Sequence, residues 1–147
     1  MVRVVYAKIL SHSAESLWRI VADVNTWPEW NDAIASVRIT DAVGIGASFD
    51  LHLRRGPLSA FRATIDTYTP HRQLRFSGGS GGIRIRCSLD CIPADLQTKM
   101  QIELEYSGPM MWLNALFGPP KSIEDLALHW ITDIEKRAHN TSHGDHR

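Results

Sequence analysis

Apolar and polar residues alternate along much of the chain, with the period of two that a β-strand shows. The first such segment is Val2–Leu10, which is rich in β-branched residues. The alternation is clearest over residues 47–54, and residues 61–66 and 83–90 repeat it. This pattern is typical of an antiparallel sheet with one face in the core and the other in water. We therefore predict about seven strands, the first followed by six more within residues 35–106.

A helical period replaces this alternation directly after the first strand. Ser13 is placed to cap a helix whose apolar face consists of Ala14, Leu17, Trp18 and Val21. A capped amphipathic helix after residue 13 is the prediction, with its apolar face turned towards the sheet.

Pro28 limits how far this first helix continues. Because a proline restricts the residue before it, we expect Trp27 to be extended and the helix to end ahead of it. Thr26–Trp30 is then predicted to form a short second helical turn. Trp27 and Trp30 bracket the proline, and two large aromatic residues so close together mark either the core or the wall of a pocket.

A long C-terminal helix is predicted to start at Ser122, with Asp125 three residues later as a variant capping box. Its apolar face consists of Ile123, Leu126, Ala127, Trp130, Ile131 and Ile134. Met110–Phe117 is compatible with a short helix before it. We expect one domain over residues 1–139 and a loose polar tail over residues 140–147.

The last two strands suggest a register. With Pro93–Leu96 as the turn, pairing residues whose numbers sum to 189 places opposite charges side by side, as for Arg86 and Glu103. The same register places Cys87 beside Ile102 on the apolar face. The arginine run around Arg86 is therefore interpreted as a solvated, ion-paired sheet face.

Charge and composition narrow the function classes. The 147 residues include sixteen basic and sixteen acidic side chains, and no basic patch indicates nucleic-acid binding. No apolar run approaches the ~20 residues of a membrane span, and the first residues lack a signal-peptide core. A cytoplasmic protein is expected. Cys87 and Cys91 would lie ~13 Å apart along one strand, too far for a disulfide, so we expect two buried free thiols.

Catalytic and metal motifs are scarce. The sequence contains no G-x-S-x-G and no H-E-x-x-H, and neither a metal site nor a cofactor is predicted. Gly78–Gly82 joins two strands and is interpreted as a hairpin turn rather than a phosphate loop. Asp32 is the one plausible general base, although a surface role is favoured. His129 lies beside the apolar face of the last helix, where an exposed position is favoured over the rim of a pocket.

The segment Ser13–Trp30, with its Trp-Pro-Glu-Trp sequence, resembles the N-terminal signature of the START/Bet v 1-like superfamily, also called SRPBCC. Within it, the chain is most similar to the bacterial polyketide cyclase/dehydrase-like group. The resemblance implies an α+β helix-grip fold of order β-α-α-β6-α, in which a curved antiparallel sheet wraps around the long C-terminal helix. It also implies a deep pocket beneath that helix for apolar small molecules.

The resemblance does not extend to the catalytic residues of the aromatase/cyclases. Those enzymes are characterised by an inward arginine on a central strand and a tyrosine shortly after the W-P motif. Approximate matching puts Thr67 and Ile34 at these two places. Ring-closing catalysis of that type is therefore not indicated by the residues.

Strand parity and the resemblance together give a set of residues expected to bind the ligand. The set is Trp30, Ile34, Phe49, Leu51, Phe61, Ile65, Thr67, Phe76, Cys87, Leu89, Met100, Ile102, Leu104, Tyr106 and Trp130. Tyr106 and Thr67 are expected to orient the ligand by hydrogen bonds, and the apolar members to bury it.

Three functions stay open at this point. The leading hypothesis is binding of an apolar small molecule such as a lipid, an isoprenoid or a polyketide-like ring system. The alternatives are a polyketide cyclase or dehydratase that works by positioning and weak acid–base groups, and a module that binds quinone or protein. A hydrophobic ligand is the expected partner in the first case, and a monomer or weak homodimer is the expected assembly.

Overall fold

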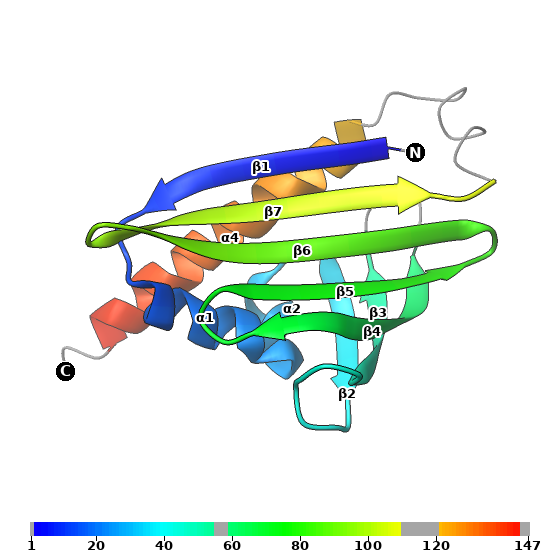
Figure 1. The fold of residues 1–147 in the computed structure, drawn as a ribbon, viewed down its shortest axis with the longest axis horizontal. Helices are drawn as coiled ribbons and strands as arrows, with labels where there is room; N and C mark the ends of the chain where they lie inside the picture. Colours follow the sequence, from blue (N-terminus) through cyan, green and yellow to red (C-terminus); the bar gives the residue numbers. More distant parts are fainter. Residues whose placement is uncertain (1, 55–58, 110–120, 145–147) are drawn as a thin grey trace.

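A single antiparallel sheet forms most of the molecule. The computed structural model describes residues 2–54, 59–109 and 121–144. The strands are β1 (Val2–Leu10), β2 (Ile34–Ile39), β3 (Ser48–Leu53), β4 (Ala60–Thr69), β5 (Gln73–Ser80), β6 (Ile83–Ala94) and β7 (Gln97–Ser107). They lie side by side in the order β1-β7-β6-β5-β4-β3-β2, as Figure 1 shows. Chain neighbours from β2 to β7 pair directly, and β1 closes the row beside β7.

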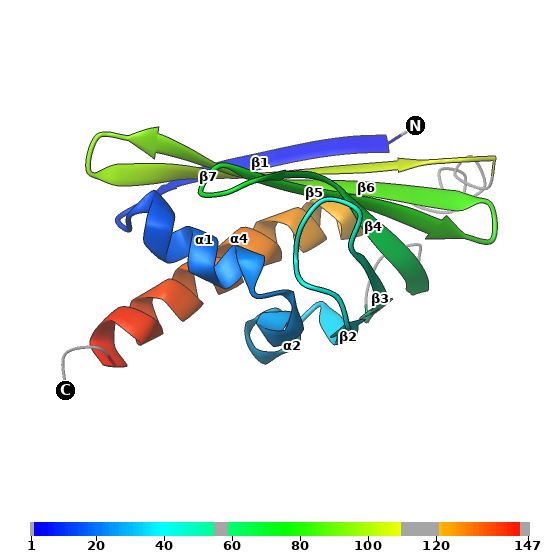
Figure 2. The ribbon, with the colours of Figure 1, turned by 60° about the horizontal axis from the view of Figure 1, so that its bottom comes forward.

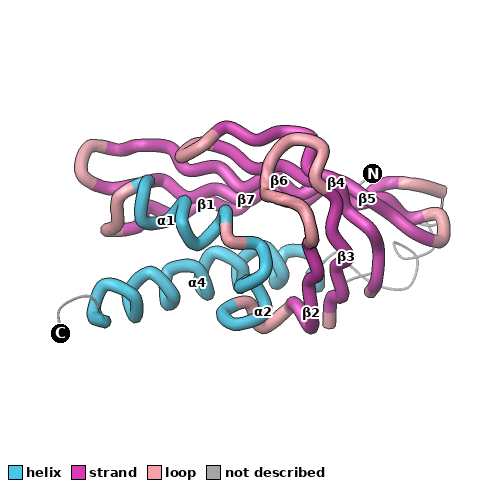
Figure 3. The backbone as a smooth tube through the Cα atoms, turned by 90° about the horizontal axis from the view of Figure 1, so that it is seen from below, coloured by secondary structure: helices cyan, strands magenta, loops and turns pink. Residues whose placement is uncertain are grey.

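The helices all lie on one face of this sheet. They are α1 (Ala14–Ala22), the 3-10 turn η1 (Val24–Thr26), α2 (Trp27–Trp30) and α4 (Lys121–Gly144). Figure 2 shows α4 crossing the concave face with α1 beside it, and Figure 3 shows β2 and β3 curling towards α2. The helix-grip fold expected from the sequence is confirmed. No helix in the described residues is long and apolar enough to cross a membrane.

The start of α1 follows the predicted capping. The Ser13 hydroxyl oxygen accepts a hydrogen bond from the Ser16 backbone N–H at 3.1 Å. Arg19 and Glu15, one turn apart, form an ion pair at 2.8 Å. Leu17 lies on the buried side of the helix, as its period requires.

The expected extended geometry of Trp27 is wrong. Its backbone is helical, with φ −50° and ψ −43°, and it begins α2 with Pro28 directly behind it. Pro28 lies in the first turn, where a missing N–H breaks no helical hydrogen bond. The Trp27 indole N–H donates to the Val21 carbonyl oxygen at 3.0 Å, and the ring is fully buried. Burial of this ring outweighs the local preference for an extended residue before proline.

The predicted register of the last hairpin is wrong by two residues. Paired residues sum to 191, so Arg86 lies opposite Glu105. The turn consists of two residues, with Asp95 at φ +58°, and Pro93 is still within β6. Pro93 lies beyond the last residue of β6 that pairs with β5, so its missing N–H removes no hydrogen bond on that side. Because two is an even shift, every side chain keeps its predicted face.

Three further predictions, about an ion pair and about the two ends of the last helix, need correction. Glu103 forms its ion pair with Arg3 of β1, not with Arg86. Residues 140–144, which the sequence assigned to a loose tail, continue α4 to Gly144, and residues 145–147 lie outside the described residues. That helix begins at Lys121, so Ser122 lies inside its first turn rather than before it. The predicted short helix Met110–Phe117 falls outside the described residues.

The core lies between the concave face and α4. All six residues of the predicted apolar face of α4 are buried, and α4 packs against β1, β7 and α1. Cys87 and Cys91 are free and buried on the concave side of β6, as predicted. This interior contains almost all of the residues that the sequence proposed for a binding site.

Candidate functional site

Four aromatic side chains from four elements meet in the interior. Trp27 of α2, Phe49 of β3, Phe76 of β5 and Trp130 of α4 are each at most 1% exposed. The ring of Trp27 lies 5.7–5.8 Å from each of the other three, centroid to centroid. Several of these contacts are edge-to-face, an arrangement that adds ~0.5–1.5 kcal/mol per pair beyond the burial itself. Sequence parity could not find Trp27, because its position depends on the irregular turn before Pro28.

The predicted site residues share this interior with few exceptions. The buried members are Ile34, Phe49, Leu51, Phe61, Ile65, Phe76, Cys87, Leu89, Met100, Ile102, Leu104, Tyr106 and Trp130. Trp30 is partly buried and packs against the same core. They come from the concave face of the sheet, from the end of α2 and from α4, which are three walls of one interior.

Thr67 is the exception on the sheet, and its predicted inward position is wrong. A β-bulge between Ile65 and Thr67 shifts β4 against β5, so Ile65 opposes Phe76 while Thr67 opposes Arg75. A bulge adds one residue to a strand and reverses the facing of the residues after it. Thr67 therefore lies on the outer face, where its hydroxyl donates to Asp66 Oδ1 at 3.1 Å.

The outer side of this bulge is held by Asp66. Its Oδ1 accepts a hydrogen bond from Arg75 Nε at 2.8 Å, and its Oδ2 accepts one from Ser77 at 3.2 Å. Burial raises the pKa of the Asp66 carboxyl, but the hydrogen bonds from Arg75, Thr67 and Ser77 outweigh it and leave the pKa below its usual value. Beyond the bulge Tyr68 faces inward, and its ring lies 5.6 Å from that of Trp18.

A row of five residues across the concave face has two small members, Ala63 and Gly78, next to Phe49. Phe49, Ala63, Gly78, Ile85 and Tyr106 are successive partners on β3 to β7. Glycine is required at the third position, because a Cβ there would lie 2.3 Å from the backbone oxygen of the neighbouring β4. The Phe61 ring covers this position as well, because a Cβ on Gly78 would lie 2.9 Å from it.

Several buried side-chain polar atoms have no hydrogen-bond partner. The Tyr106 hydroxyl and the indole N–H of Trp130 are buried and have no hydrogen-bond partner in the described part of the chain. The same holds for the Trp30 indole N–H and the Asn31 side-chain N–H2. Leaving such a group unpaired costs ~1–3 kcal/mol, so buried polar atoms without partners call for a physical explanation.

The ionisable groups of the interior are held neutral. Burial raises the pKa of the Cys87 thiol well above its usual range and that of Cys91 to about 12. Burial, and then the nearby Cys87, raises the pKa of the Tyr106 phenol. No Lys, Arg, His, Asp or Glu side chain is buried among the described residues. The interior therefore offers no charged group at neutral pH within that part of the chain.

The two candidates for acid–base chemistry lie at the surface. The Asp32 side chain is 66% exposed and forms an ion pair with Arg54 at 4.0 Å. The Asp32 backbone carbonyl accepts a hydrogen bond from Arg54, and its N–H donates to Asp133 of α4. His129 is exposed, with its ring Nδ1 2.7 Å from the Asp125 carbonyl oxygen. Both therefore occupy the surface positions that the sequence favoured. Within the described ranges, no three His, Cys, Asp or Glu side chains group as metal ligands would.

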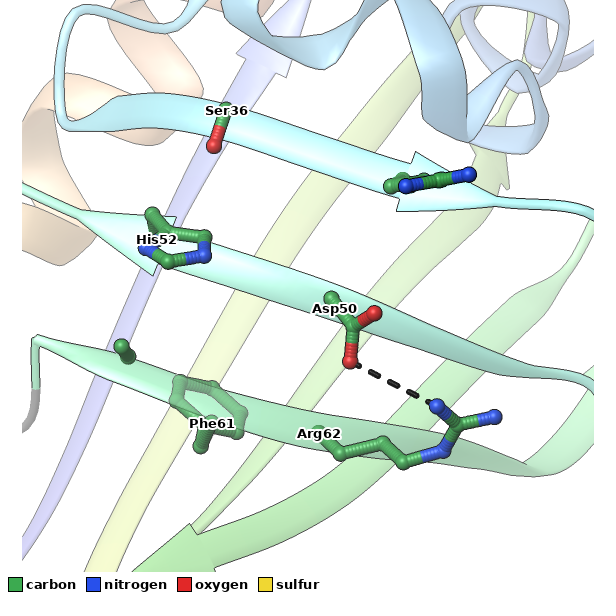
Figure 4. Close-up of a pocket in the computed structure, with 7 residues that line it drawn as sticks. Ser36, Asp50, His52, Phe61 and Arg62 are labelled. Atoms are coloured by element: carbon green, nitrogen blue, oxygen red, sulfur yellow. Dashed lines mark ion pairs between the residues drawn. The ribbon is translucent and has the colours of Figure 1, made fainter.

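A separate groove of about 590 Å³ lies on the outer face of β2, β3 and β4 (Figure 4). Most of its lining comes from two cross-strand rows, Arg38–Asp50–Arg62 and Ser36–His52–Ala60. Asp50 and Arg62 form an ion pair at 3.6 Å, and both side chains stay more than half exposed. Such a pair contributes at most ~1 kcal/mol. The alternation of polar and apolar residues placed Asp50, His52 and Arg62 on the solvent face, but it could not show the groove, because the groove depends on the pairing of three strands.

Comparison with protein-family models shows one family for this chain. The family model described as polyketide cyclase/dehydrase and lipid transport matches residues 1–136. No curated protein sequence matches the chain. The neighbours among solved structures are similar over nearly the full chain but at low sequence identity, so they show the fold alone.

Three of these structural neighbours each align with almost the whole chain. A protein from Thermus thermophilus is 15% identical with a TM-score of 0.77, covering 96% of this chain and 99% of its own. A START superfamily protein from Mycobacterium smegmatis is 18% identical with a TM-score of 0.72, covering 95% and 98%. The Zhui aromatase/cyclase from a Streptomyces species is 13% identical with a TM-score of 0.77, covering 94% and 93%.

Proposed function

This chain belongs to the polyketide cyclase/dehydrase and lipid transport family, and on that premise we propose that it binds an apolar small molecule between the curved sheet and α4. The observation that carries the proposal is the pair of unpartnered polar atoms on Tyr106 and Trp130, set among apolar side chains from both walls. A lining that is mainly apolar, with a few polar groups to fix orientation, is what such ligands require.

The neutrality of the interior supports binding over acid–base catalysis. A general acid or base works best with a pKa near the operating pH. The thiols and the phenol of the interior have pKa values far above neutrality, so they neither accept nor release a proton readily at pH 7. Shape, exclusion of water and hydrogen bonding are the means that this site offers.

Titration with Nile red, a neutral apolar dye, tests the proposal. We expect saturable binding with one site, and energy transfer to the dye from the buried tryptophans Trp27 and Trp130. Tyr106→Phe removes one hydrogen bond and should weaken binding by ~0.5–1.5 kcal/mol. Tyr68→Phe is the matched control, because the Tyr68 hydroxyl is not among the unpartnered buried atoms.

Either of two results would contradict the proposal. Dye binding that does not saturate, or that is unchanged by Tyr106→Phe and by an apolar competitor, would place the dye elsewhere. Native mass spectrometry of the freshly purified protein supplies the complementary measurement. A bound mass that is lost on denaturation and displaced by the dye supports the proposal.

A further inference from the structure

The two borders of the sheet differ in how their outer edges are protected. β2, at one border, has only six residues, and its pairing with β3 is interrupted by a bulge between Ile34 and Ser36. The Ile34 N–H donates to the Asn31 carbonyl oxygen at 3.1 Å. The Asn25 side-chain amide bonds the backbone of Ile39 twice, accepting from its N–H at 3.3 Å and donating to its carbonyl oxygen at 3.5 Å. A short, bulged and capped edge resists the addition of another strand.

β1, at the other border, has none of these protections. It is nine residues long, contains neither proline nor glycine, and pairs with β7 without a bulge. Within the described residues, no backbone hydrogen bond reaches its outer edge, and Figure 1 shows β1 as the border of the sheet. α4 contacts β1 from the concave side, where Lys8 and Glu135 form an ion pair at 2.7 Å. A long edge strand with unpaired N–H and C=O groups is a template for a further strand.

Exposed apolar side chains gather along this open border. On the outer face Val5 is 48% and Ile9 is 55% exposed, and Ala7 between them is exposed as well. Below the edge, Leu128 is exposed and lies two helical turns before Glu135, on the side of α4 that is ion-paired to β1. The edge therefore combines free backbone hydrogen-bonding groups with apolar surface above and below them, which are the two features that an added strand uses.

We propose that β1 pairs antiparallel with β1 of a second copy of this chain across a two-fold axis, so that two seven-stranded sheets join edge to edge. A second copy fits because each described sheet has one open border, and that border is itself an extended strand. Since the β2 border is capped, a third copy has no edge to add to, and the assembly closes at two chains. This interface is separate from the proposed binding of a small molecule and does not depend on it.

The side chains of β1 are compatible with this self-pairing. With the two-fold axis at Tyr6, all nine residues of each strand have a partner. On the outer face Val5 then lies opposite Ala7 of the second copy, and Ile9 lies opposite Arg3. A shift by one residue would place Arg3 opposite Lys8, a like-charge pair, and would bring side chains of opposite faces together. The alignment centred on Tyr6 avoids both penalties.

The size of the contact limits its strength. Nine paired residues extend over only ~30 Å. One strand edge with its flanking side chains buries less than the ~1,200–2,000 Å² of a stable interface. We therefore expect a weak dimer, with a dissociation constant between ~1 µM and ~1 mM.

Sedimentation velocity of the full chain over this concentration range measures the assembly. The sedimentation coefficient should rise from that of a 16.5 kDa monomer to that of a dimer and no further. Val5→Lys and Ile9→Lys should each weaken the association about 10-fold or more, because both place a positive charge in the contact and Ile9→Lys places it opposite Arg3. Ile45→Lys is the matched control, since Ile45 is 74% exposed but lies in the loop between β2 and β3.

Amide hydrogen exchange of the unmodified protein provides a second readout that needs no substitution. Amides of β1 should exchange more slowly at ~1 mM than at ~10 µM protein, because pairing protects the outer edge. A chain that stays monomeric up to ~1 mM, with unchanged exchange in β1, would overturn the proposal. A dimer that Val5→Lys and Ile9→Lys leave intact, or that Ile45→Lys weakens equally, would use another surface and would also overturn it. Species larger than a dimer would contradict closure at two chains.

Discussion

Trp27 and Trp30 flank the same proline but occupy different environments. Trp27 is fully buried, its indole is hydrogen-bonded to Val21, and it contacts three other aromatic rings. Trp30 is partly buried and its indole N–H has no partner in the described residues. At the scale of single residues, Trp27 belongs to the core, whereas Trp30 is only partly buried, and we propose that it contacts the ligand.

This difference predicts different results for two matched substitutions. Trp27→Ala should lower the free energy of unfolding by ~3–5 kcal/mol, the usual cost of removing a large buried aromatic side chain. Trp30→Ala should cost less than half of that and should weaken Nile red binding more strongly. Urea unfolding and dye titration on the same samples measure both. Equal destabilisation by the two substitutions would contradict this assignment.

The buried thiols predict a dependence of stability on alkaline pH. The pKa of Cys91 is about 12 in the folded protein against 9.0 for a free thiol, so the folded state keeps a proton that the unfolded state releases. The stabilisation is complete below pH 9 and is lost as pH rises towards 12. The slope should be ~1.4 kcal/mol per pH unit for each such thiol.

Urea unfolding at several values between about pH 8 and pH 11 measures this slope, and Cys91→Ala is the control that should reduce it. A free energy of unfolding with the same pH slope in both proteins would mean that Cys91 titrates normally. In the native protein at pH 8, both thiols should also react slowly with a thiol reagent and react rapidly after unfolding.

At the scale of elements, the sequence predicted the strands and their faces but not how all of them align. Alternation predicts which side chains share a face, because the period of two is a local property. The register of β6 against β7 was two residues off because it depends on a tight turn at Asp95, and Pro93 wrongly suggested an earlier one. The bulge before Thr67 leaves no trace in the period, so its reversed facing was missed.

Engineered disulfides test the observed register directly. Arg86 and Glu105 are opposite residues in exposed or partly exposed positions, so Arg86→Cys with Glu105→Cys should form a disulfide under mild oxidation. Arg86→Cys with Glu103→Cys, the pair of the sequence-based register, is diagonal at ~7–8 Å and should not. Mass spectrometry of peptides after alkylation separates the two. Faster oxidation of the second pair would contradict the observed register.

At the scale of the whole molecule, the curved sheet and α4 enclose an interior that is apolar and neutral. The sequence predicted nearly all of its lining, because strand parity and helical period both select residues that face inward. It could not predict which buried polar atoms lack partners, since that depends on the three-dimensional surroundings of each atom. Trp130 was predicted only as an apolar member of the site, and its unpartnered N–H became visible in the structure.

The central claim, that a small apolar molecule binds in this interior, is tested most directly by the tryptophan indole signals in a nitrogen–proton correlation spectrum. Each signal is assigned by a single Trp→Phe substitution. On titration with fluorenone, the account predicts large, saturable shifts for Trp130, whose N–H has no protein partner in the described residues, and a smaller shift for Trp27, whose N–H is bonded to Val21. Saturable binding that leaves the Trp130 signal in place would contradict the claim.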